Sequence, residues 1–347
     1  MLSAVAAHAG PVGEAHRVIF DDKAALRDAE HSSNLRVTVW YPAAADSIET
    51  PLRVGPSGRQ PMFDVGRAAP DAAFAPDSGR RPVILLSHGF GGTARIMGWF
   101  GVAMARNGYL VVAVDHPGNN AVDKMTVAGA ALWWNRADDL RIALDAMERD
   151  PAIGPHLDMT RVAAAGFSAG GFTTLVLAGA RVDRAHFLQF CAAHPTDGVC
   201  LPQREFAMSD QDAAQAFRVP EVAAEAAHAG DDHAIPDLRA AFAIAPALVQ
   251  ALDPQSLMQM RTPIKIVLGD ADAVAPPSTN GLIAAAAIPG AELERLPAVG
   301  HYDFLAPCTQ AGQIAVPVCK VSVPQQETHD RAIGAALAFF ARHLGAQ

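Results

Sequence analysis

The sequence has few residues of the kinds on which special classes of protein depend. It has only four cysteines, and aromatic residues make up 6% and charged residues 18% of its 347 positions. Its 28 glycines and 25 prolines follow no period, which excludes a collagen-like or low-complexity chain. We find no internal repeat. Because 50% of the residues are hydrophobic, the composition is that of a folded globular protein with a sizeable core.

Long apolar runs and runs of positive charge are also missing. No stretch of about 18 uninterrupted apolar residues occurs, so we expect no transmembrane segment. The net charge is −9 and no cluster of Lys or Arg could follow a phosphate backbone, so we expect no nucleic-acid partner. The histidines lack the close spacing of metal ligands, and the sequence therefore predicts no metal site.

The four cysteines fall into two local pairs, each around a loop-like segment. Cys191 precedes Cys200, and Cys308 precedes Cys319. These pairs lack the tighter spacing of zinc ligands, so we expect the disulfides Cys191–Cys200 and Cys308–Cys319, with four unrelated thiols as the alternative. Disulfides favour a periplasmic or secreted protein, and a cytoplasmic one is the alternative.

The N-terminal segment 1–10 leaves the same two locations open. It is small and apolar, and Ala7-His8-Ala9 resembles a signal-peptidase site. However, it has neither a basic n-region nor a full apolar h-region. It is either the remnant of a trimmed signal or a loose cytosolic N-terminus.

Strand-like and helix-like patterns alternate along the chain. We expect strands at 35–40, 82–87, 109–114, 161–166, 240–245, 263–269 and 291–296, and helices at 94–106, 135–149, 172–180 and 327–344. In helix 135–149 the apolar residues share one face, and we expect its charges to lie elsewhere. The alternation predicts an α/β fold with a mostly parallel central sheet and helices on both faces.

Two segments interrupt this pattern. Residues 41–81 are rich in Pro, Ala and Gly, and we expect a long irregular excursion. Residues 181–238 are expected to form a cap, or lid, inserted into a single domain that spans residues 1–347. Phe187, Leu188 and Phe190 would line an acyl pocket or simply pack the cap onto the core. Likewise, Trp133 and Trp134 would both lie at the edge of the cleft, or one would lie in the core and the other on the surface.

A G-x-S-x-G motif lies at a predicted strand-to-helix junction. The motif is Gly166-Phe167-Ser168-Ala169-Gly170. At such a junction the turn strains the backbone of the serine, and only glycine leaves room on either side. The sequence therefore predicts that Ser168 is a nucleophile presented above the sheet, with a plain glycine-rich turn as the alternative.

A serine nucleophile needs a base and an orienting carboxylate later in the chain. His301, in a loop after the last predicted strand, is the candidate base, and a hydrogen-bonded loop histidine is the alternative. Asp270 and Asp272 both follow the strand that ends at Gly269. We prefer Asp272, because G-x-x-D-x-x-x-P loops at strand ends place the acid there.

An oxyanion hole requires two backbone N–H groups. One should belong to Ala169, directly after the nucleophile. The other should come from the glycine-rich loop His88-Gly89-Phe90-Gly91-Gly92, and we assign it to Phe90. A plain glycine-rich turn is again the alternative.

Together these motifs resemble the α/β-hydrolase superfamily, in particular the predicted dienelactone hydrolases and the platelet-activating-factor acetylhydrolases. Dienelactone hydrolases carry a cysteine nucleophile where this chain has Ser168. The acetylhydrolases place their acid after the strand that follows the nucleophile helix, where this chain has Ala243-Ile244-Ala245-Pro246 without a carboxylate. The resemblance spans about residues 18–343 and rests on Trp40-Tyr41-Pro42, Ser87-His88-Gly89-Phe90-Gly91, Asp115-His116-Pro117-Gly118, Gly166–Gly171 and Gly300-His301.

The resemblance implies a cofactor-free serine esterase with an α/β-hydrolase fold. It would cleave carboxylic esters through an acyl-enzyme, on a small-molecule or polymeric substrate. A polyester, lactone or phospholipid-acetyl hydrolase with the same mechanism is the alternative. The second class is a catalytically silent binding protein with the hydrolase fold. Physiological ester and oligomeric state do not follow from the sequence.

Overall fold

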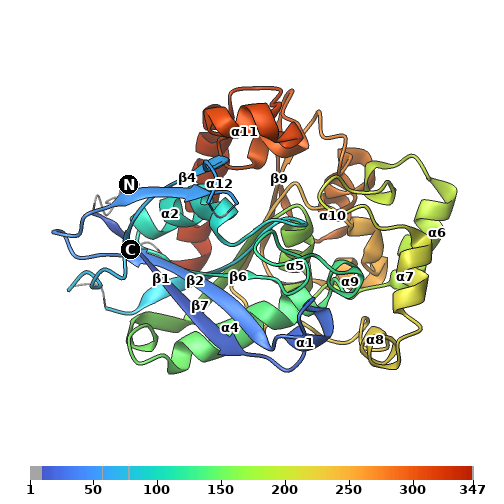
Figure 1. Cartoon of the computed structure of the whole chain (residues 1–347), viewed down its shortest axis with the longest axis horizontal. Coiled ribbons are helices and arrows are strands. Elements are labelled where there is room, and N and C mark those ends of the chain that lie inside the picture. Colours follow the sequence, from blue (N-terminus) through green and yellow to red (C-terminus); the bar gives the residue numbers. More distant parts are fainter. Residues whose placement is uncertain (1–9, 57, 77–78, 346–347) are drawn as a thin grey trace.

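The computed structural model describes residues 10–56, 58–76 and 79–345, so Ala7-His8-Ala9 lies outside the described part. Ten strands form one sheet in the order β10-β9-β8-β7-β5-β6-β2-β1-β4-β3 (Figure 1). The strands are β1 (Val12–Phe20), β2 (Asn34–Pro42), β3 (Thr50–Val54), β4 (Phe63–Pro70), β5 (Arg81–Ser87), β6 (Leu110–Asp115), β7 (Leu157–Phe167), β8 (Ala240–Ile244), β9 (Ile264–Gly269) and β10 (Glu292–Leu296).

Helices connect the strands, as the strand–helix alternation predicted. They are α1 (Ala24–Arg27), α2 (Gly98–Arg106), α3 (Val127–Ala131), α4 (Asn135–Arg149), α5 (Ala169–Leu177), α6 (Arg184–Ala193), α7 (Asp210–Ala216), α8 (Pro220–Ala226), α9 (Pro254–Gln259), α10 (Gly281–Ala287), α11 (Gln310–Ala315) and α12 (Gln325–Leu344). Among the described residues, no helix is both long enough and apolar enough to cross a membrane.

The sheet is parallel from β10 to β6, and β2 joins β6 in the antiparallel direction. The inner strands are buried on both faces, which explains their continuous apolar sequences. One core cluster packs α4, α5 and α10 on one face, and a second packs α2 and α12 on the other. This arrangement confirms the predicted α/β fold class and brings the carboxyl ends of β5, β7 and β9 to one edge.

The segment predicted to be irregular contains two strands. Residues 41–81 include β3 and β4, which extend the sheet beyond β1. The sequence did not reveal them because they lie at the sheet margin, where one side stays exposed and apolar residues do not alternate regularly. β1 was also missed. α5 begins at Ala169, three residues earlier than predicted, directly after the Ser168 turn.

The segment predicted to be a cap consists of α6, α7 and α8, which connect α5 to β8 (Figure 1). A disulfide joins Cys191 in α6 to Cys200. The second disulfide, Cys308–Cys319, spans α11. The structure thus contains both cysteine pairings expected from the sequence.

The first turn of α4 differs from its prediction. We expected the charges of this helix to face away from the core, yet Asn135, Arg136, Asp138 and Asp139 are all buried. The apolar face begins only at Leu140. Within this turn Arg136 and Asp139 hydrogen-bond to other buried polar groups, whereas the Asn135 amide has no partner among the described residues; helical periodicity alone reveals neither.

Candidate active site

Ser168 occupies a strained turn between β7 and α5. Its φ is 58° and its ψ is −120°, in a region that residues with a Cβ rarely adopt. The backbone around the flanking glycines leaves no room for a side chain. A Cβ on Gly166, for example, would lie 2.2 Å from the carbonyl oxygen of Gly170. The turn therefore places the Ser168 side chain at the carboxyl end of the sheet, as the motif predicted.

His301 lies within hydrogen-bond distance of Ser168. It stands in a 3-10 turn, His301–Phe304, that follows β10. Its Nε2 atom is 2.8 Å from Ser168 Oγ, and both side chains are almost fully buried. The Phe167 ring lies 4.8 Å from the imidazole ring and restricts its position. The base and the nucleophile, 133 residues apart, thus meet in a suitable geometry for proton transfer.

Asp272 completes this contact on the other side of the imidazole. His301 Nδ1 lies 2.6 Å from Asp272 Oδ2. The second oxygen, Oδ1, accepts the backbone N–H groups of Val274 and Ala275 at 2.9 and 2.8 Å. These bonds hold the carboxylate so that His301 Nδ1 carries the proton and Nε2 is left to accept one.

Phe90 and Ala169, the two residues predicted to donate to an oxyanion, both lie near Ser168. Both residues line the same cavity as Ser168. Within the described part of the chain, neither N–H has a hydrogen-bond acceptor. Gly89 brings the Phe90 loop close to the turn, since a Cβ on it would lie 3.4 Å from Ser168 Cβ. Two free donors at this position suit a developing oxyanion.

The cavity next to Ser168 has a volume of about 630 Å³ and lies under the 181–238 segment. Trp133, Phe187 and Leu188 line it, whereas Trp134 is fully buried in the core and Phe190 is not part of the wall. All the described side chains that line the cavity are uncharged, and most are apolar. The wall also includes both half-cystines of Cys191–Cys200.

Glu205 links the 181–238 segment to both sides of the cleft. Tyr302, next to His301, donates a hydrogen bond to Glu205 Oε1 at 3.2 Å. On the other side, a Cβ on Gly91 would lie 2.8 Å from Glu205 Cβ, so this residue packs against the loop after Phe90. The segment therefore contacts both the loop after Phe90 and the residue next to His301.

Sequence reasoning missed a second, fully buried set of Ser, His and Asp. Ser87 Oγ lies 2.8 Å from His116 Nε2, and His116 Nδ1 lies 2.8 Å from Asp139 Oδ2. None of the three side chains is exposed to solvent. The sequence signal was the charged first turn of α4, whose charges helical periodicity predicts to lie off the apolar face. As for metals, no cluster of three or more suitable ligands occurs among the residues that the structure describes.

Comparison with known proteins supports the fold. The profile of the family described as platelet-activating factor acetylhydrolase, isoform II, matches residues 66–150. This stretch contains the Phe90 loop and the first turn of α4, but not Ser168, Asp272 or His301.

Two cutinases from Thermobifida resemble a similar fraction of the chain. Cutinase est2 of Thermobifida alba is 35% identical over 102 residues, which are 29% of this chain and 31% of that protein. Cutinase cut1 of Thermobifida fusca is 33% identical over 102 residues, 29% of each protein. The match therefore spans less than a third of the cutinases' length.

Solved structures match over nearly the whole chain. A ferulic acid esterase from Streptomyces cinnamoneus has a TM-score of 0.60 at 21% identity and covers 99% of this chain and 93% of its own. A puromycin-hydrolysing peptidase from Mycobacterium tuberculosis has a TM-score of 0.52 at 15% identity over 96% of this chain and 40% of its own. At such low identity these structures establish the fold alone. Together the matches show that the chain has the α/β-hydrolase fold and is similar, over part of its length, to the acetylhydrolase family and to the cutinases.

Proposed function

We propose that this protein is a serine hydrolase of carboxylic esters. The observation that carries the proposal is the position of His301, which lies 2.8 Å from Ser168 Oγ through Nε2 and 2.6 Å from Asp272 through Nδ1. The names of the cutinases and of the ferulic acid esterase agree with ester hydrolysis. No metal ion or cofactor is needed in this proposal.

The proposed reaction begins when Ser168 Oγ attacks the ester carbonyl and its proton passes to His301 Nε2. Asp272 stabilises the imidazolium and keeps it oriented. The N–H groups of Phe90 and Ala169 donate to the oxyanion of the tetrahedral intermediate. His301 then protonates the departing alcohol, and a water molecule, deprotonated by His301, hydrolyses the acyl-enzyme.

The lining of the cavity limits the substrate class. A charged acyl or alcohol group would lose its hydration against walls that offer it no counter-charge, which is unfavourable. We therefore propose an uncharged ester with an apolar group of moderate size. Polyesters and lactones fit this description, whereas phospholipid acetyl esters undergo the same reaction but carry a charged headgroup. A panel of soluble esters, lactones, polyesters and phospholipid acetyl esters distinguishes them.

We further propose that residues 181–238 act as a cap on a single domain that spans the chain. Glu205 and the wall of the cavity support this role, because both bring the segment over Ser168. The two disulfides support an oxidising location, periplasmic or secreted. In this proposal the protein has an ester as its partner and no nucleic acid.

The test is labelling by a fluorophosphonate together with hydrolysis of a p-nitrophenyl ester panel. The wild type should be labelled once, at Ser168, and should hydrolyse apolar esters. Ser168→Ala should lose the label and at least about 10³-fold of the activity. Full activity in Ser168→Ala would refute the proposal. A wild type that binds esters but shows neither label nor turnover would instead indicate a catalytically silent binding protein.

A further inference from the structure

Arg136 lies between the two chain segments that carry the proposed oxyanion donors. It is the second residue of α4 and is only 1% exposed. Its Nη2 donates a short hydrogen bond to the carbonyl oxygen of His88, at the start of the Phe90 loop. Its Nε donates to Thr173 Oγ1 at 3.2 Å. One guanidinium thus contacts both the loop and the nucleophile helix.

Thr173 extends this contact to the second donor. Its hydroxyl donates to the carbonyl oxygen of Ala169 at 2.9 Å. The carbonyl of His88 and the N–H of Phe90 are separated by a single residue, Gly89, which has no Cβ to limit its backbone; its carbonyl lies 2.6 Å from His88 Nδ1 and accepts the Gly92 N–H at 3.1 Å. Hydrogen bonds at His88 and Ala169 therefore restrict the peptide units next to both oxyanion donors.

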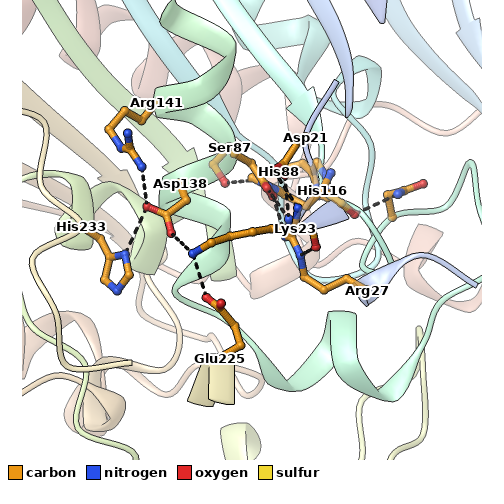
Figure 2. Close-up of polar contacts among 12 residues, drawn as sticks. Asp21, Lys23, Arg27, Ser87, His88, His116, Asp138, Arg141, Glu225 and His233 are labelled. Atoms are coloured by element: carbon orange, nitrogen blue, oxygen red, sulfur yellow. Dashed lines mark hydrogen bonds and ion pairs between the residues drawn. The ribbon is translucent and has the colours of Figure 1, made fainter. Parts of the chain in front are cut away.

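The buried Ser87, His116 and Asp139 also help to hold Arg136, and Figure 2 shows Ser87, His88 and His116 grouped together. Arg136 Nη2 also donates to Ser87 Oγ at 3.3 Å. Because Asp139 can only accept, His116 Nδ1 carries its proton, Nε2 accepts from Ser87, and Ser87 Oγ is free to accept from Arg136. Burial and the nearby arginines keep the pKa of His116 well below its usual value, so the imidazole is neutral.

Holding a cation here has a cost to stability. Burial lowers the pKa of Arg136 to about 9, although the charge of Asp139 opposes the shift. The side chain lies at a helix N-terminus, where the helix dipole disfavours positive charge. Its Nη1 lacks an acceptor among the described residues. An apolar side chain would avoid these costs. The presence of a guanidinium here is therefore better explained by the backbone and side-chain groups that it holds in position.

We propose that Arg136 is a positioning residue for the oxyanion hole, holding the Phe90 loop and the start of α5 at the separation that the tetrahedral intermediate requires. This inference rests on the proposed hydrolase function. It assigns the buried Ser87, His116 and Asp139 a supporting role, since no substrate can reach them. The planar guanidinium fork suits this task because lysine cannot bond in two fixed directions at once.

The experiment compares the wild type with Arg136→Lys, Arg136→Met and Thr173→Val. Active sites are counted by the end-point of fluorophosphonate labelling, so kcat refers only to folded, competent protein. For a p-nitrophenyl ester, we expect Arg136→Lys and Arg136→Met to lower kcat about 10- to 100-fold with little change in KM. Thr173→Val, which keeps size but removes the hydroxyl, should cause a smaller loss of kcat.

A tetrahedral-intermediate mimic separates positioning from simple loss of structure. A phenylboronic acid adds to Ser168 and places an oxygen in the oxyanion hole, so its affinity should fall in parallel with kcat. The matched control is Arg27→Met, because Arg27 is 2% exposed and pairs with the same Asp139 but does not contact the loop. It should lower the melting temperature while leaving kcat and boronate affinity within about threefold.

The outcomes discriminate between the two proposals. If Arg136→Met does not fold, Arg136→Lys and Thr173→Val still decide the question. Unchanged kcat and boronate affinity in both of these variants would overturn the positioning role while leaving the hydrolase proposal intact. A wild type without esterase activity or labelling would overturn the hydrolase proposal itself.

Discussion

His301 Nδ1 lies 2.6 Å from Asp272 Oδ2, although another aspartate stands only two residues earlier. Asp270 is exposed and pairs instead with Arg295 at 2.7 Å. Asp272 is buried and accepts hydrogen bonds from two backbone N–H groups, which fix the orientation of its carboxyl group.

This difference predicts unequal effects of two matched substitutions. Asp272→Asn should lower kcat about 10³- to 10⁴-fold, because an amide favours the wrong imidazole tautomer and does not stabilise the imidazolium. Asp270→Asn should change kcat by less than about threefold. Steady-state kinetics on a p-nitrophenyl ester measures both, and equal losses would argue against Asp272 as the acid.

Because the cavity is uncharged, we expect a carboxylate in its wall to weaken the binding of apolar groups. Leu188 lines the cavity and is 59% exposed, so Leu188→Asp should fold. For an ester with an apolar acyl chain, kcat/KM should fall about tenfold, and the acetate ester should be affected less. Leu188→Met, which keeps the apolar volume, is the control. If all esters responded alike to Leu188→Asp, the acyl group would not bind in this cavity.

Removing each of the two disulfides should have a similar effect on stability but a different effect on KM. Each closes a short loop, with sequence separations of 9 and 11, so removing either should destabilise the protein by about 2 to 3 kcal/mol. Only Cys191 and Cys200 line the cavity, so only their replacement by serine should also raise KM for apolar esters. Thermal melting and steady-state kinetics of Cys191→Ser/Cys200→Ser and Cys308→Ser/Cys319→Ser would show this contrast. A KM change in the second variant would contradict it.

His329 should make the fold sensitive to acid. It is buried, stacks on Trp99 at 3.9 Å and donates to the carbonyl of Leu305 at 2.9 Å. Burial lowers its pKa to about 4, against roughly 6.5 in an unfolded chain. As the pH falls through this range, the unfolded chain binds a proton at His329 and the folded protein does not. The free energy of unfolding therefore decreases, by up to about 3 kcal/mol.

His329→Gln tests this linkage, since glutamine retains an N–H donor but does not titrate. Its melting temperature should fall less than that of the wild type between pH 7 and pH 4. The control is His194→Gln, at an exposed position, which should follow the wild-type pH profile. Parallel profiles for His329→Gln and the wild type would show that His329 is not responsible.

Several elements were predictable because they depend on residues close together in the chain. α4 has the predicted bounds, and the buried parallel strands lie within a residue or two of their predicted positions, except that β7 begins four residues before its predicted start at residue 161. The strands β1, β3 and β4 were missed because they are stabilised by pairing with each other and with β2 at the margin of the sheet. A short half-exposed strand has little apolar pattern of its own.

The sequence by itself determined the strained turn at Ser168, because a strand, a glycine-flanked serine and a helix are adjacent in the chain. It also placed His301 and two aspartates in loops at strand ends, and it paired the cysteines by their short separations, although a helix, α11, occupies the expected loop between Cys308 and Cys319. The tertiary structure decided which aspartate meets the imidazole, which aromatic residues line the cavity, and that Arg136 lies beneath the Phe90 loop. These depend on side chains from segments tens to more than a hundred residues apart, whose orientation is set by packing and not by local spacing.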